Sequence, residues 1–265
     1  MTTMYAIYDT ETNGLPDKKY SFENVHITQL AFIITDGTRN YIRKEYLIKE
    51  DYEISDFITK LTGITREKVD KDGIPFAEAW RLFNGYLEEY KCEYIIAHNA
   101  NFDTRVMKAA YKRMKSNSNS GTYPELDMTL FNDIKSRNIF TSAFINLFKY
   151  SPKILINIDV ILKNNTSNDM IAADIKLLID IVKEDYRNYG EKFFKIIHAD
   201  SLPYYRKLYP SKEKKIHKLL NHKLETIHNH IVGPYVQTHT ALDDCYMLQN
   251  CINKTNFKLN DFIFA

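Results

Sequence analysis

The sequence predicts an α/β fold, a sheet flanked by helices, and two observations carry that prediction. Short apolar segments with the character of strands alternate along the chain with longer segments whose apolar residues recur every three or four positions. The composition is that of a globular domain, with 44% hydrophobic and 26% charged residues. A length of 265 residues suits one large domain, or one domain that carries an insertion.

Five segments are expected to form strands. Residues 4–8 and 94–97 are short apolar runs, and residues 195–200 are expected to form another core strand. Residues 27–35 are strongly apolar, which predicts a strand buried on both faces. Residues 40–48 alternate more between apolar and polar side chains, which suits a further strand.

Outside residues 117–194, three segments are expected to form helices. Residues 76–90 carry apolar side chains at helical spacing. The second helix covers residues 101–115, where Val106 lies on an apolar stripe and Thr104 is expected to point away from it. The third covers residues 240–253. The inward stripe of this third helix consists of Ala241, Cys245, Leu248 and Ile252.

The segment between the second helix and the last strand is less regular. Residues 117–121 have the composition of a loop. Helices are expected near 127–148 and 169–188, whereas the apolar run 153–163 fits either a strand or a helix.

Charge and cysteine content exclude several classes of protein. The formal net charge of +2 is too small to identify a polyanionic partner, so any nucleic-acid face must come from the distribution of charge. Three cysteines without a CxxC pair argue against a disulfide framework and fit a reducing compartment, the cytoplasm or the nucleus. The chain has neither a basic and apolar leader nor an uncharged apolar run near 18 residues, so no signal peptide and no membrane partner are expected.

Four acidic side chains are expected to face inward. Asp9 and Glu11 follow the first strand two residues apart, so they project to one side and repel each other unless a cation lies between them. Asp103 falls within the apolar edge of its helix. Asp244, unlike its neighbour Asp243, lies beside the inward stripe of the closing helix. A carboxylate that faces the core is costly unless it is paired or binds a metal.

A histidine accompanies these acids. His239 stands just before the closing helix, where it can reach the same pocket. Each residue alone has an ordinary explanation, such as a turn after a strand, an acid in the first turn of a helix, or a surface histidine. Four inward acids together with one histidine are better explained by a metal centre, and carboxylate oxygens favour Mg²⁺ or Mn²⁺.

Three motifs in the chain resemble those of the DEDDh 3′–5′ exonucleases, the DnaQ-like family related to polymerase proofreading subunits. They are YDTETNGL (8–15), AHNANFDTRVM (97–107) and HTALDDC (239–245). Intervening segments are also similar to the family: LTGITREKV, GIPFAEAWRLFNGYL, and the stretch from ADSLPYYRKLYP to NHKLETI. A D-x-E pair alone carries no information, whereas three motifs in this order and context are highly specific.

The resemblance implies an RNase H-like mixed sheet and a site with two divalent ions, Mg²⁺ or Mn²⁺, for hydrolysis of a phosphodiester. Asp9 would bridge both ions, and Glu11, Asp103 and Asp244 would complete the set of ligands. His239 would accept the proton of the attacking water, a role that suits a histidine near neutral pH.

The same resemblance assigns the contacts with the substrate. The backbone around Thr10 and Thr12 and the apolar side chain of Leu15 would hold the terminal nucleotide. The pocket for the terminal and penultimate nucleotides would be lined by His98, Asn99 and Phe102. Wedging and stacking by apolar side chains tolerate any base, which fits an enzyme that acts on a 3′ end rather than on a sequence.

The chain departs from the family in length. Residues 117–194 exceed what compact members place between the second motif and the next strand. This predicts a single exonuclease domain over residues 1–265 with a mostly helical insertion at about 117–194. The insertion is expected to cap the site, contact nucleic acid or bind a partner, and a tolerated embellishment is the alternative.

The resemblance therefore implies a metal-dependent 3′–5′ exonuclease that releases nucleoside monophosphates from single-stranded or frayed 3′ ends, with DNA favoured over RNA. An exoribonuclease is the alternative within this class. The alternatives from another functional class are a non-catalytic nucleic-acid-binding module and a subunit whose insertion docks a polymerase or another replication or repair protein. The basic stretch 206–223 either follows the phosphates of a bound strand or is a solvated helix face.

Overall fold

The computed structural model describes residues 3–16, 21–118, 192–209, 222–235, 239–255 and 257. The chain divides into two compact units, Met1–Lys115 with Lys192–Ala265, and Ser116–Glu191. The second unit covers most of the expected insertion. Its residues from 119 onward, with the elements predicted near 127–148, 153–163 and 169–188, lie outside the described residues. The insertion and its helices therefore stay predictions.

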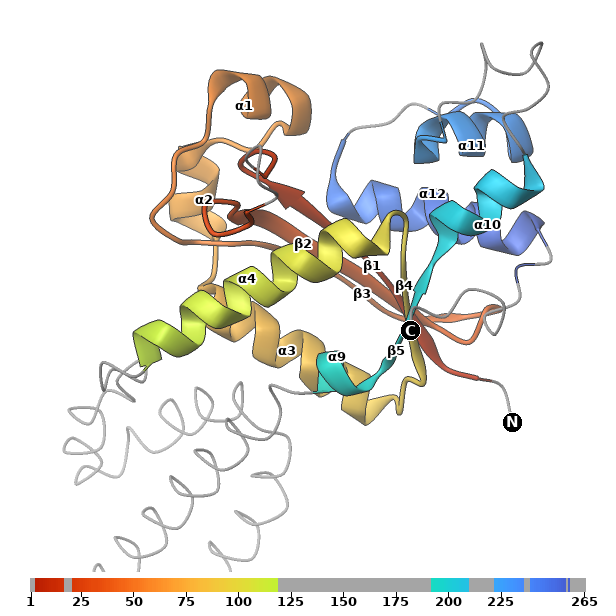
Figure 1. Cartoon of the computed structure of the whole chain (residues 1–265), viewed down its shortest axis with the longest axis horizontal. Helices are drawn as coiled ribbons and strands as arrows, with labels where there is room; N and C mark the ends of the chain where they lie inside the picture. The colour runs from red at the N-terminus through yellow and green to blue at the C-terminus, as the bar shows by residue number, and fades with distance from the viewer. Residues whose placement is uncertain are drawn as a thin grey trace, which may run out of the picture. The chain divides into compact units, whose positions relative to one another are not determined.

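A five-stranded mixed sheet with the order β3-β2-β1-β4-β5 lies at the centre of the first unit (Figure 1). Strand β1 (Tyr5–Thr12) pairs antiparallel with β2 (Ile27–Thr35), which pairs antiparallel with β3 (Asn40–Leu47). On its other side β1 pairs parallel with β4 (Tyr94–Ala97), which pairs parallel with β5 (Ile197–Asp200). The predicted α/β fold with its mixed sheet is confirmed.

Two strands differ at their ends from the prediction. β1 continues four residues past the predicted run 4–8, so that Asp9 and Glu11 lie within the strand. β5 begins at Ile197 because Lys192–Lys195 form the short helix α9. The parallel pairing of β1, β4 and β5 brings the carboxyl ends of these three strands to one edge of the sheet, where the motif residues begin.

Helices cover both faces of the sheet (Figure 1). On one face α3 (Phe76–Glu89), α4 (Ala100–Ser118) and α9 pack on the sheet. This core contains the buried side chains of Tyr8, Phe32, Trp80, Phe83, Val106 and Phe193. Trp80 and Phe193 lie edge to face at 5.2 Å, which joins α3 to the chain that returns after residue 191.

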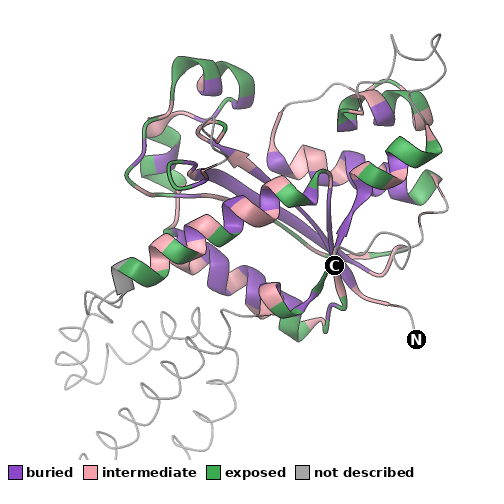
Figure 2. Ribbon diagram, in the orientation of Figure 1, coloured by how far each residue is buried: buried purple, intermediate pink, exposed green. Residues whose placement is uncertain are grey.

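On the opposite face α10 (Ser201–Leu208), α11 (Leu224–Ile231) and α12 (Ala241–Lys254) form the second core. The predicted inward stripe of α12 is buried along its whole length, from Ala241 to Ile252. Because side chains alternate along β1, Tyr5 and Ile7 enter this core, and Asp9 and Glu11 project to the same side. Figure 2 shows the central strands buried and the outer faces of the helices exposed.

Several short helices were not predicted. They are α1 (Asp56–Thr62), α2 (Arg66–Asp72), α9, α10 and α11. None is longer than eight residues, so each offers too few periodic positions to be recognised from the sequence. Ser55 and Thr65 accept backbone hydrogen bonds at the starts of α1 and α2, as residues at this position of a helix often do.

Two predictions about α4 were wrong. The helix continues to Ser118, so residues 117 and 118 are helical and do not belong to a loop. Thr104 does not point away from the protein, since its hydroxyl lies 3.1 Å from the hydroxyl of Tyr8 and 3.3 Å from Nδ1 of His198. The helical periodicity predicted an exposed position for this polar residue, but Tyr8 on β1 and His198 on β5 provide polar partners for it inside the protein. Among the described helices, none has the length and apolar character needed to cross a membrane.

Candidate active site

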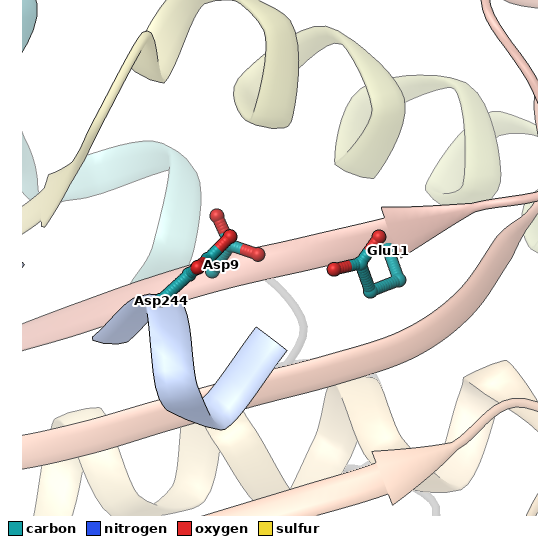
Figure 3. A group of neighbouring side chains, drawn as sticks. All are labelled: Asp9, Glu11 and Asp244. Atoms are coloured by element: carbon teal, nitrogen blue, oxygen red, sulfur yellow. The ribbon is translucent and has the colours of Figure 1, made fainter. Parts of the chain in front are cut away.

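Three carboxylates from two elements meet at one edge of the sheet. Asp9 and Glu11 project from β1, and Asp244 comes from the first turn of α12, directed toward Asp9 (Figure 3). One oxygen from each of the three side chains lies within 4.8 Å of the other two. All three residues are half-buried. The sequence separates Asp244 from the other two acids by more than 230 positions, and the packing of α12 on β1 closes that distance.

Asp103 stands next to this group and has its own hydrogen bonds. It lies in the first turn of α4 and is only 3% exposed. Its Oδ1 accepts a hydrogen bond from the backbone N–H of Thr10 at 3.1 Å and another from the Thr10 hydroxyl at 2.7 Å. Asp103 is not among the three acids that meet within 4.8 Å, so the structure brings three of the four predicted ligands into one group.

The charged forms of Asp9 and Glu11 are destabilised by burial and by the neighbouring acids. Burial, followed by the charges of Asp103, Asp244 and Glu11, raises the pKa of Asp9 well above its ordinary value. Burial, together with the charges of Asp244 and Asp103, raises the pKa of Glu11 to about 7. Burial also raises the pKa of Asp103 to about 7, although the hydrogen bonds from Thr10 act in the opposite direction.

This arrangement fits a divalent cation. A cluster of carboxylates that repel one another favours a positive charge between them, and its donors are all oxygens, which suit Mg²⁺ or Mn²⁺. Within the described residues, the three cysteines are all buried and unpaired, and none belongs to the acidic group. The donor set therefore does not have the thiolates typical of a structural zinc site.

His239 immediately precedes the cap of α12. Its backbone has a φ of 53°, in the left-handed region that a non-glycine residue rarely adopts. The next residue, Thr240, starts the helix, because its hydroxyl accepts a hydrogen bond from the N–H of Asp243. The side chain of Asp243 accepts a hydrogen bond from the Tyr235 hydroxyl at 3.2 Å and lies outside the acidic group. Of the two adjacent acids it is Asp244 that joins the group, as the helical pattern predicted.

Three of the predicted substrate residues lie where β4 gives way to α4, His98 and Asn99 in the turn and Phe102 in the first turn of the helix. His98 is held by the protein itself, with Nε2 2.9 Å from the carbonyl of His222 and Nδ1 2.9 Å from the Ser201 hydroxyl. A carbonyl only accepts, so Nε2 carries the proton and Nδ1 accepts from Ser201. Burial lowers the pKa of His98, which keeps the ring neutral. Both nitrogens are therefore engaged, and the ring can offer a ligand mainly its carbon atoms.

Asn99, in the turn, and Phe102, in the first turn of α4, differ in exposure. Asn99 is exposed, has a φ of 69°, and donates its backbone N–H to Oδ1 of Asp200 at 3.0 Å. Phe102 is half-buried, and its ring lies edge to face with that of Phe22, with 5.7 Å between the ring centroids. Asp200 was not predicted as a residue of the site. The sequence feature that could have indicated it is an acid at the end of an apolar strand, directly before a serine. Its Oδ1 also caps α10 by accepting the N–H of Leu202.

The end of β1 supplies the remaining predicted substrate residues. The Thr12 hydroxyl donates to the carbonyl of Gly14 at 2.8 Å, which closes the turn after the strand. The backbone of Asn13 donates to the carbonyl of His26, so the turn is fixed to the start of β2. Leu15 is 82% exposed, as an apolar side chain that contacts a ligand would be in the free protein.

The chain is similar to known proteins in sequence. A family model described as Exonuclease (RNase_T) matches residues 6–154. Over 141 residues, 52% of its length, the chain is 30% identical to the DNA polymerase III PolC-type of Caldanaerobacter subterraneus. Over 107 residues, 40% of the chain, it is 34% identical to the DNA polymerase III PolC-type of Mycoplasmopsis pulmonis. These matches span 9% and 7% of the two polymerases, so the chain corresponds to a small part of each.

Solved structures show the same fold. A structure of exonuclease I aligns with 94% of this chain and 40% of its own, with a TM-score of 0.53 and 16% identity. The zinc-bound complex of Escherichia coli exonuclease I with single-stranded DNA aligns with 95% of this chain and 40% of its own, with a TM-score of 0.52 and 16% identity. At this identity the likeness supports the mixed sheet and its helices. The family model matches more than half of the sequence, over a range that includes the first two acidic motifs, so the chain belongs to the exonuclease family.

Proposed function

We propose that this chain is a metal-dependent 3′–5′ exonuclease that releases nucleoside monophosphates from single-stranded or frayed 3′ ends, with DNA favoured over RNA. The observation that carries this proposal is the acidic group of Asp9, Glu11 and Asp244, with Asp103 beside it. An exonuclease-family domain with these oxygen donors supports phosphodiester hydrolysis.

Asp9, Glu11 and Asp244 would hold two divalent ions, Mg²⁺ or Mn²⁺, and Asp103 would complete the set of ligands. When bound, such ions supply an activated water and stabilise the charge that develops on the leaving oxygen. Thr10 keeps the carboxylate of Asp103 oriented through its two hydrogen bonds.

His239 would take the proton from the attacking water. Its position just before the first turn of α12 places it next to the helix that carries Asp244. Histidine is the side chain best suited to accept and release a proton near neutral pH.

The terminal nucleotide would lie over the end of β1 and the start of α4. As the family motifs imply, the backbone of Thr10 and Thr12 would contact it, together with the exposed Leu15, Asn99 in the turn and Phe102 in the first turn of α4. His98 would contribute a ring surface and hold the turn in place, since its nitrogens are bound to Ser201 and His222.

DNA is favoured because the relatives with the matching sequence are named DNA polymerases. An exoribonuclease is the alternative, since the fold serves both polymers and the choice depends on contacts near the sugar 2′ position. The same relatives favour a polymerase, or another replication or repair protein, as the protein partner.

A nuclease assay tests the proposal. Purified protein is incubated with 5′-labelled single-stranded DNA and RNA of the same sequence, in Mg²⁺, in Mn²⁺ and in EDTA. We expect a ladder of 3′-shortened products in either metal, faster on DNA, and none in EDTA or with Asp9→Ala. Asp243→Ala is the matched control, because it removes the adjacent acid outside the group and should leave the ladder. Failure to shorten either polymer under any metal condition would favour the non-catalytic module, and capture of a polymerase by the inactive chain would support docking.

A further inference from the structure

Gln29 is a buried amide in a strand that is otherwise built for the core. It lies in β2, every residue of which is buried, and is itself 6% exposed. In the register of the sheet it stands opposite Glu11 on β1. Its side chain projects to the face of Ala31 and Ile33, which α12 covers. A polar side chain at this place in a core requires hydrogen-bond partners.

Both ends of the Gln29 amide have such partners. Oε1 accepts a hydrogen bond from the backbone N–H of Ala241 at 2.9 Å, and Nε2 donates to Oε2 of Glu45 on β3 at 3.3 Å. An N–H can only donate and an ionised carboxylate can only accept, so the chemistry of the two partners fixes the orientation of the amide. Glu45 thus holds the carbonyl of Gln29 against the start of α12.

The Ala241 N–H needs this partner. Ala241 is the first residue of α12 and is fully buried, and the first N–H groups of a helix find no acceptor within the helix. Two residues earlier His239 has its left-handed backbone, a conformation that persists only where neighbours hold it. Three residues later Asp244 joins the acidic group. The hydrogen bond to Gln29 therefore lies between His239, just before α12, and Asp244, in its first turn, the two residues of this region that the reaction would use.

We propose that Gln29 is a positioning residue for the exonuclease reaction. It fixes the first turn of α12 relative to β1, and so sets where His239 and Asp244 stand with respect to Asp9 and Glu11. This inference rests on the proposed function for its effect on turnover, whereas its effect on the start of α12 is independent of that function.

The same helix offers a matched control. Near its other end Gln249 forms a pair of amide hydrogen bonds with Asn40 of β3, with Asn40 Nδ2 donating to Gln249 Oε1 at 2.9 Å. Gln249 is 7% exposed, close to the value for Gln29. Gln29→Met and Gln249→Met therefore each remove a buried amide side chain that joins α12 to the sheet, one beside the acidic group and one away from it.

Turnover is the first measurement. For Gln29→Met we expect kcat on a single-stranded oligonucleotide to fall by about 10- to 100-fold, as when residues that orient metal ligands are changed, with KM within about twofold. For Gln249→Met we expect kcat close to that of the unsubstituted protein. The pair Gln29→Glu with Glu45→Gln exchanges acceptor and donor, keeps both hydrogen bonds, and should recover most of the kcat.

Amide hydrogen exchange is the second measurement and needs no turnover. In metal-free protein that remains folded, exchange at the Ala241 amide should accelerate about tenfold or more in Gln29→Met, and remain slow in Gln249→Met and in the exchanged pair. The inference is overturned if the Ala241 amide exchanges at the same rate in Gln29→Met and Gln249→Met, or if both variants lose kcat equally. If the unsubstituted protein shortens no polymer, the proposed function fails, and the exchange rates still decide whether Gln29 fixes the start of α12.

Discussion

Thr10 donates two hydrogen bonds to a single carboxylate oxygen of Asp103, one from its backbone and one from its hydroxyl. The pair joins β1, which carries the first two acids, to α4, which carries another. The family resemblance assigns the backbone around Thr10 to the substrate. In the structure the N–H of Thr10 is already bound to Asp103, so its first role is to orient a carboxylate.

Thr10→Val should weaken the binding of divalent ions. The change removes the hydroxyl bond at 2.7 Å but keeps the shape of the side chain and the backbone bond. Because partners of metal ligands set the orientation of those ligands, we expect the apparent affinity for Mn²⁺ to fall by about 10-fold or more. Isothermal titration measures it. Thr10→Ser keeps the hydroxyl and serves as the control, and equal affinities for the two variants would contradict the role of this hydrogen bond.

Asp9→Asn should abolish turnover and stabilise the metal-free protein. Asp9 is crowded by the charges of Asp103, Asp244 and Glu11, so an uncharged amide relieves repulsion that only a cation otherwise offsets. In EDTA we expect the Tm to rise, by about 2–4 °C for each kcal/mol of repulsion relieved.

Addition of Mg²⁺ should then raise the Tm of the unsubstituted protein much more than that of Asp9→Asn. Thermal unfolding with and without Mg²⁺ measures both effects. A Tm for Asp9→Asn below that of the unsubstituted protein in EDTA would show that the acidic group is not under electrostatic repulsion.

The stability of the metal-free protein should fall as pH rises toward 8. The pKa values of Glu11 and Asp103 are raised to about 7 from ordinary values of 4.5 and 3.8, so the folded protein binds more protons than the unfolded chain between these limits. The stability that these two carboxyl groups contribute is fully present at a pH below their ordinary pKa values. It is lost as the pH rises through about 7, where the two groups ionise in the folded protein.

The Tm in EDTA between pH 5 and pH 8 checks this expectation. Glu11→Gln removes one of the two groups and should flatten the dependence on pH. Because bound cations require deprotonated carboxylates, stabilisation by Mg²⁺ should be larger at pH 8 than at pH 5. A Mg²⁺ effect that grows toward low pH would rule out carboxylates as the ligands.

His239→Gln should slow hydrolysis and leave metal binding largely intact. General-base catalysis contributes about 10²- to 10⁴-fold, so we expect a loss of kcat in that range with Mn²⁺ affinity retained. Single-turnover rates on a labelled oligonucleotide provide the measurement. Turnover equal to that of the unsubstituted protein would exclude His239 as the base.

Most strands and long helices of the first unit can be predicted from the amino-acid sequence. The long strand β2 was visible because nine consecutive positions suit a buried strand, and α3, α4 and α12 because their apolar residues recur at helical spacing over three turns or more. The same periodicity separated Asp244 from Asp243, since the direction of a side chain on a helix follows from its position alone. Local rules suffice wherever a segment is long enough for its pattern to repeat.

The hydrogen-bond partners of the site residues, in contrast, depend on how the strands and helices pack. Oδ1 of Asp103 accepts two hydrogen bonds from Thr10, and His98 binds Ser201 and His222. Gln29 reaches Ala241 across more than 200 residues of sequence. A hydrogen bond forms with whatever group the packing of strands and helices brings within about 3 Å. A partner that is distant along the chain therefore cannot be predicted from a single sequence. The sequence motifs thus predicted the four acids, whereas the packing of α4 and α12 on β1 and β2 sets their positions and their hydrogen-bond partners.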